Sequence, residues 1–207
     1  MHPLLRRLAL VITIATLAAP GIASARQLGN GGTTFSSLSK QTPPEAFLGR
    51  FVELAHADLV ANGTLLDALG VPAAARPATA TLAALDMNAT TTDIANAAAA
   101  AGATHQLVTQ SLAAAPPLGD AGKSSFASGA LALAQAARDF TDLTKNIGAT
   151  KQALVTAGMP ARVALHAARY TPEVAAQLRA ELKAVVAFAD ANQVSLASAV
   201  KEAAASL

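Results

Sequence analysis

Large apolar residues recur every seven positions along the stretch 123–147, at Phe126, Leu133, Phe140 and Ile147. Seven residues is close to two turns of an α-helix, so these side chains fall on one stripe of a helix. Small residues flank the stripe, namely Gly129, Ala130, Ala136 and Ala137. Large residues beside small ones are typical of a surface that a second helix approaches closely. The pattern predicts a central helix over 123–147 that Gly148 ends.

Three further stretches combine helical spacing of apolar residues with helix-start signals. Thr42-Pro43-Pro44-Glu45 starts a helix that Asn62-Gly63 ends, and Thr90 with Asp93 caps a helix that runs to about Ala114. Thr171-Pro172-Glu173 starts the last long helix, which ends near Asn192. The apolar face of this last helix is predicted to be Val174, Leu178, Leu182, Val185 and Ala189.

Shorter helical stretches are expected to cover the long ones, at 64–69, 79–85, 149–157, 161–170 and 196–205. The link 116–122 between the second and the central helix is short, which favours antiparallel neighbours. Together these elements predict an all-α fold, an up-and-down helical bundle with about four long helices and several short ones. We expect residues 42–207 to form this single domain, preceded by a flexible leader over the Gly-, Ser- and Thr-rich residues 26–41.

The first 25 residues have the order of a secretory signal peptide. Arg6 and Arg7 precede an apolar run of 12 residues, Pro20-Gly21 breaks that run, and Ala23-Ser24-Ala25 provides small residues for cleavage. The apolar run is too short to span a membrane. We therefore expect cleavage after Ala25 and a periplasmic or secreted protein without a membrane span.

Composition narrows the classes of function. Alanine supplies 55 of the 207 residues, there is no Trp, and only one Tyr, which suits closely packed helices better than a β-sandwich. Removal of residues 1–25 takes away Arg6 and Arg7 and leaves 13 basic and 13 acidic residues. Because the mature chain has no basic excess, we expect no nucleic-acid partner. Without Cys, neither a disulfide framework nor covalent haem attachment is possible.

One short motif resembles a phosphate-binding loop. Gly119-Asp120-Ala121-Gly122-Lys123-Ser124 ends in the right residues, but Pro117 stands where the first Gly of the motif is needed. The motif also requires a preceding strand, and the preceding residues have helical spacing. We therefore predict that Lys123 has no nucleotide role.

Three histidines remain after signal cleavage, His56, His105 and His166, one on each of three predicted helices. Neither His105 nor His166 has a His or carboxylate at the helical spacing of three or four residues that metal ligands usually show. His105 shares a helix side with Ala98, Ala101, Val108 and Leu112. An apolar surrounding disfavours the imidazolium ion, so the sequence predicts a depressed pKa for His105. A role as a metal or haem ligand is the alternative to a half-buried His with one hydrogen bond.

No arrangement of residues predicts catalysis. The chain has no Gly-x-Ser-x-Gly elbow, and Asp139 and Asp142 share a predicted surface face with Arg138 and Lys145. We therefore expect no enzyme, no catalytic residues, no metal site and no cofactor. The expected function is a secreted or periplasmic, non-enzymatic interaction or adaptor protein of the cell envelope, with another envelope protein as its partner. The alternative is a binding module that holds a small apolar ligand between its helices.

Overall fold

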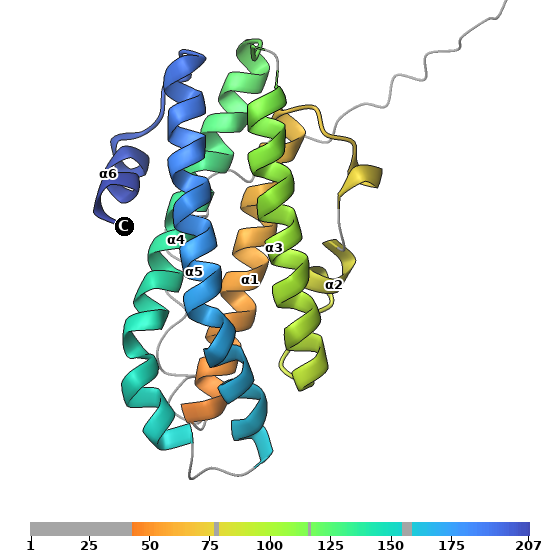
Figure 1. Cartoon of the computed structure of the whole chain (residues 1–207), viewed down its shortest axis with the longest axis vertical. Coiled ribbons are helices and arrows are strands. Elements are labelled where there is room, and N and C mark those ends of the chain that lie inside the picture. Colours follow the sequence, from red (N-terminus) through yellow and green to blue (C-terminus); the bar gives the residue numbers. More distant parts are fainter. Residues whose placement is uncertain (1–42, 77–78, 116, 155–158) are drawn as a thin grey trace, which may run out of the picture. The chain divides into compact units, whose positions relative to one another are not determined.

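The computed structural model places four long helices side by side (Figure 1) and describes residues 43–76, 79–115, 117–154 and 159–207. The long helices are α1 (Pro43–Ala68), α3 (Thr91–Ala114), α4 (Asp120–Leu154) and α5 (Met159–Ala191). The short elements are a 3-10 helix (Ala73–Ala75), α2 (Thr79–Ala83) and α6 (Ser198–Ser206). Since the described residues contain helices and no strand, the predicted all-α bundle is confirmed. The predicted signal peptide (1–25) and leader (26–41) lie outside the described residues.

Contacts between side chains of different helices show which helices are parallel and which are antiparallel. Phe51 of α1 packs edge-on against Phe140 of α4, with ring centroids 6.1 Å apart, and Leu65 of α1 lies against Gly129, so α1 and α4 are antiparallel. Phe126 near the start of α4 meets Phe188 near the end of α5, at 5.1 Å between ring centroids. Helices α1 and α5 therefore run one way and α4 the other, as the colours of Figure 1 show. The colours of Figure 1 also show that α3 runs in the direction of α1.

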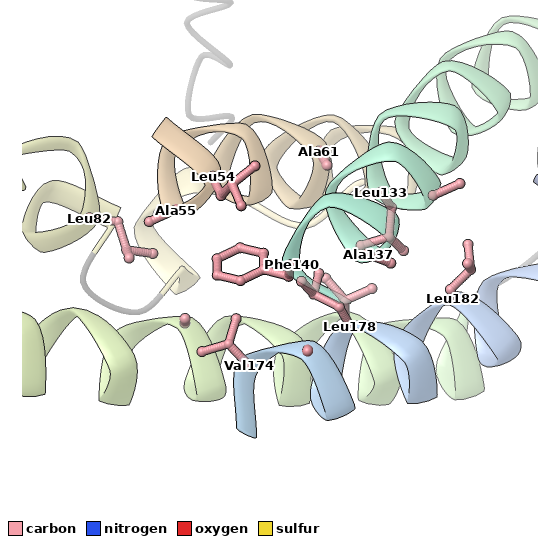
Figure 2. Packing of buried hydrophobic residues seen from close by; sticks show 14 of the residues in the cluster. Leu54, Ala55, Ala61, Leu82, Leu133, Ala137, Phe140, Val174, Leu178 and Leu182 are labelled. Atoms are coloured by element: carbon pink, nitrogen blue, oxygen red, sulfur yellow. The ribbon is translucent and has the colours of Figure 1, made fainter. Parts of the chain in front are cut away.

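The central stripe of α4 is buried as predicted. Phe126, Leu133 and Phe140 are at most 1% exposed, and Ile147 is 6% exposed. Figure 2 shows Phe140 pointing into the layer between Leu54 of α1 and Leu178 of α5. The flanking small residues are buried too, as expected for a close helix contact. Most large side chains of the core come from α1, α4 and α5, and α3 adds Ile94, Val108 and Leu112.

Three predicted helix ends are wrong. Helix α1 continues through Gly63 to Ala68, so the predicted turn at 64–69 is its last part, and α4 continues through Gly148 to Leu154. Pro172 lies inside α5, which joins the predicted pieces 161–170 and 171–192. A Gly inside a helix costs about 1 kcal/mol and a Pro about 3 kcal/mol. At Gly63 and Pro172, burial of the neighbouring side chains offsets this cost, and Thr171 and Val174 are at most 4% exposed. After Gly63, for example, Leu65 and Leu66 are both 0% exposed.

The predicted start of α3 is confirmed in detail. Asp93 N–H donates to the Thr90 hydroxyl at 3.2 Å, and Thr90 N–H donates to the Asp93 carboxylate at 2.8 Å. These bonds form a capping box. The bonds that the Thr90 N–H and hydroxyl donate to the Asp93 carboxylate lower the pKa of Asp93, because they favour its charged form. Helix α3 packs on α5, α1 and α2. No helix within the described ranges is long and apolar enough to cross a membrane.

Candidate functional site

A carboxylate interrupts the buried face of α1. Asp58 is 1% exposed, although its neighbours one turn before and after it, Leu54 and Ala61, belong to the apolar core. Asn62, which is 0% exposed, lies one turn further along and donates from Nδ2 to Oδ1 of Asp58 at 2.6 Å. The sequence predicted Asn62 as a helix end. Because α1 continues past it, Asn62 instead supports a buried carboxylate.

His105 of α3 and Glu181 of α5 complete the cluster with Asp58. His105 is 4% exposed and Glu181 is 2% exposed. Nδ1 of His105 donates to Oε2 of Glu181, and Nε2 on the other side of the ring lies 3.4 Å from Oδ2 of Asp58. The imidazole therefore lies between two carboxylates that come from two other helices. We call Asp58, His105, Glu181 and Asn62 the core cluster.

Several polar atoms of the core cluster have no hydrogen-bond partner. They are His105 Nε2, Asn62 Oδ1 and Glu181 Oε1, all buried. Buried polar groups are nearly always paired, so each exception needs a physical explanation. A proton on Nε2 of His105 turns this atom into a donor toward Oδ2 of Asp58, which lies 3.4 Å away. The geometry therefore favours a cluster that holds protons.

The pKa shifts within the core cluster also favour bound protons. Burial raises the pKa of Asp58 to about 7, an effect that His105 opposes and Glu181 reinforces. Burial also raises the pKa of Glu181, and the hydrogen bond from His105 offsets only part of this effect. For His105, burial disfavours the imidazolium ion, but Asp58 and Glu181 outweigh it and raise the pKa. The predicted depression of the His105 pKa is wrong, because carboxylates from α1 and α5 meet the ring.

The hollow beside the core cluster is small. A cavity of about 10 Å³ borders Asp58 and is otherwise lined by apolar side chains that include Phe51, Leu82, Phe140 and Val174. This volume matches a single water molecule. Ligand pockets typically measure ~300–1,000 Å³, so this hollow does not admit a substrate to the cluster.

The other candidate residues lie apart from the core cluster. His166 packs edge-on against Tyr170 with ring centroids 5.3 Å apart, and His56 is half-buried on α1. Asp142 pairs with Lys145 at 3.0 Å on the surface. Asp139 accepts a hydrogen bond from the Arg50 guanidinium at 3.1 Å. Both aspartates therefore form ion pairs on a solvated face of α4. Among the described residues, no group of three or more His, Asp or Glu side chains is arranged to hold a metal ion.

A groove opens on the surface beside the first turns of α4. It measures about 530 Å³, and its lining is Lys123, Ser124, Ala127, Ser128, Leu131, Gln193, Ser195 and Ala197. Leu131 is 47% exposed, which is unusual for a large apolar side chain of this protein. Helix α3, and not a strand, precedes the motif at residues 119–124, of which residues 120–124 already belong to α4. The absence of a nucleotide role for Lys123 stays a prediction.

Backbone strain marks the same groove. Gln193 has φ 53°, and among the described residues no other non-glycine has positive φ. It follows the end of α5, where Val194 N–H donates to the Ala189 carbonyl at 2.8 Å, and Gly is the usual residue at such a position. The left-handed conformation costs a non-glycine residue about 1–2 kcal/mol. Backbone strain of this kind clusters at functional sites.

Comparison of the chain with protein-family models, with curated proteins and with solved structures gave no match. The interpretation of its function therefore depends on the geometry of the core cluster and of the groove.

Proposed function

We propose that this chain is a non-enzymatic interaction protein of the cell envelope, which recognises another envelope protein through the groove beside Leu131. The observation that carries the proposal is the coincidence of two unfavourable features at one place. Leu131 exposes apolar area to solvent, and Gln193 holds a strained backbone, and both side chains line the groove. A contact that buries Leu131 and uses the Gln193 amide would give both features a role.

The closed core supports a non-enzymatic role. The three titratable groups that are close enough for acid–base chemistry are at most 4% exposed, and the hollow beside them has room for one water molecule. A catalytic acid or base must come within hydrogen-bond reach of its substrate. The core cluster offers a substrate no such approach.

The alternative function, a small apolar ligand held between the helices, has weaker support. The interior cavity is about 10 Å³, and the groove is open with polar residues in its lining. A further hollow of about 240 Å³ beside Leu48, Met87 and Val163 is smaller than the ~300–1,000 Å³ typical of ligand pockets, and Glu45 and Asn88 are part of its lining. Periplasmic or secreted localisation is part of the proposal and rests on the order of charged, apolar and small residues in 1–25.

Site-specific photo-crosslinking in the native envelope tests this function. A photoreactive phenylalanine analogue replaces Leu131 in one variant and Val60 in the control, because Val60 is 65% exposed on α1 and is not part of the groove lining. We expect a discrete protein adduct from position 131 and none from position 60. Equal adducts from both positions, or none from 131, would contradict the proposal. A small molecule that copurifies and is seen by native mass spectrometry would favour the alternative.

A further inference from the structure

The core cluster is electrically neutral only when it holds two protons. When both carboxyl groups are ionised and the His105 imidazole is neutral, Asp58, His105 and Glu181 together carry two negative charges. Each further proton that the cluster binds adds one positive charge. With His105 protonated and both carboxylates ionised, one negative charge is left over in the core. An uncompensated buried charge is strongly unfavourable, so a second proton relieves the cluster.

No other charge within the described residues compensates the cluster. The ion pairs of Asp58 and Glu181 are both with His105. Helix α2 contains no titratable residue, and the other charged residue of α3, Asp93, caps its first turn. Helix α4 turns Leu133, Ala137 and Phe140 toward the core.

The remaining charged groups near these helices lie toward the surface. Arg138 of α4 donates to the Ala199 carbonyl of α6 at 2.8 Å, and Lys201 of α6 pairs with Asp190 of α5. On α1, His56 lies two residues before Asp58 and therefore on a different side of the helix. On α5, Lys183 is exposed and Arg179, two residues before Glu181, is half-buried. The protonation of the cluster is therefore set by its own three groups.

Helix α3 is the long helix that depends most on this cluster. Its buried residues are Ile94, Ala97, Ala100, Ala101, Thr104, His105, Val108 and Leu112, so only three of them are large and apolar. Ala contributes little apolar area, and hydrophobic attachment scales with that area. By contrast, α1 and α4 contact each other through Phe and Leu side chains. His105 is the residue that ties α3 to both α1 and α5.

We infer that the core cluster is a proton-operated latch: two bound protons hold α3 against α1 and α5, and loss of one proton lets α3 open locally. The latch closes in mildly acidic surroundings and loosens toward neutral and alkaline pH. The raised pKa of Asp58, about 7, places this change near neutrality. The latch is independent of the groove beside Leu131, so either proposal can fail without the other.

Hydrogen exchange of backbone amides in the intact protein tests the latch. Opening of α3 releases a proton, because solvated Asp58 is ionised at these pH values. The opening constant of amides 101–108, corrected for intrinsic exchange, should therefore rise about tenfold per pH unit from about pH 5 to about pH 6.5. The Asp58→Asn variant keeps the shape and lacks the titrating group, so its opening constant should change less than about threefold over the same range.

Two controls make the outcome decisive. Asp142→Asn removes an exposed carboxylate that pairs with Lys145 and should leave the pH dependence of α3 as in the wild type. If Asp58→Asn does not fold, Glu181→Gln removes the same surplus charge and should likewise flatten the response. A pH-independent opening constant in the wild type, or an unchanged pH dependence in the folded variant, would overturn the latch. Protection that rises with pH and disappears on chelation would also overturn it, because a metal ion competes with protons for these groups.

Discussion

Replacement of Gly129 by Ala tests the close contact between α1 and α4. A Cβ atom at this position would lie 2.9 Å from Cγ of Leu65, 3.1 Å from Cδ2 and 3.1 Å from the backbone nitrogen of Leu65. Carbon atoms in good packing are ~3.5–4.0 Å apart. The side chain of Leu65 is 0% exposed, and its backbone nitrogen is fixed in α1. The added methyl group must therefore push the two helices apart.

The expected magnitude is a balance of two effects. Gly→Ala in the middle of a helix gains about 1 kcal/mol of helix propensity. Overpacking of a filled core costs typically ~1–3 kcal/mol, and contacts below 3.0 Å to Cγ and near 3.1 Å to backbone belong at the upper end of that range. We expect Gly129→Ala to lower the free energy of unfolding by about 1–2 kcal/mol.

Two other glycines are matched controls for this prediction. Gly63 in α1 and Gly148 in α4 both lie inside helices, and a Cβ added at either meets nothing within 4 Å. Gly63→Ala and Gly148→Ala should each stabilise the protein by about 0.5–1 kcal/mol. Urea denaturation followed by circular dichroism measures all three variants. If Gly129→Ala stabilises the protein as much as the controls do, the helices do not approach as closely as described and the reasoning fails.

Three further predictions concern the core, the cluster and the strained turn. Phe140→Ala should cost about 3–5 kcal/mol in urea denaturation, since the ring is 1% exposed, and a loss below about 0.5 kcal/mol would place the ring at the surface. A raised pKa for Asp58 means that the folded state binds its proton more tightly than the unfolded state, so stability is lost as pH rises through about 7. The free energy of unfolding should fall by about 2–3 kcal/mol from pH 5 to pH 8, and Asp58→Asn should flatten this dependence. Gln193→Gly should raise the thermal midpoint, with a gain of about 1 kcal/mol, and unchanged stability would show that the turn is unstrained.

The helices were predictable from the sequence because their apolar stripes are local patterns. The seven-residue spacing of Phe126, Leu133 and Phe140 identified the core face of α4, and Thr90 with Asp93 identified the start of α3. The helix ends were harder to predict from the sequence. The helix-breaking effect of a Gly or a Pro is local, and it competes with the burial of side chains elsewhere in the helix. At Gly63 and Pro172 the burial of neighbouring side chains outweighs the local preference, and the residues next to them in sequence do not reveal this burial.

The core cluster was not found from the sequence because its members come from three helices. His105 lacks a carboxylate three or four residues away on α3, and its partners are distant in the chain. The sequence nevertheless contained one indication of the core cluster, at Glu181. Glu181 is three residues after Leu178 and four before Val185, so it lies within the predicted apolar stripe of α5. A carboxylate within an apolar stripe indicates a buried charge that needs a partner.

Carboxylates from α1 and α5 converge on His105, and the protonation of this ring is the most direct test of that arrangement. Nitrogen NMR of protein labelled with ¹⁵N in histidine, with the His105→Gln variant to assign the signal, follows the ring through a pH titration. Because Asp58 and Glu181 outweigh the effect of burial, the His105 ring should stay an imidazolium ion as the pH rises past 6.5. Loss of the ring proton below pH 6.5, as expected for a histidine among apolar side chains alone, would contradict the account.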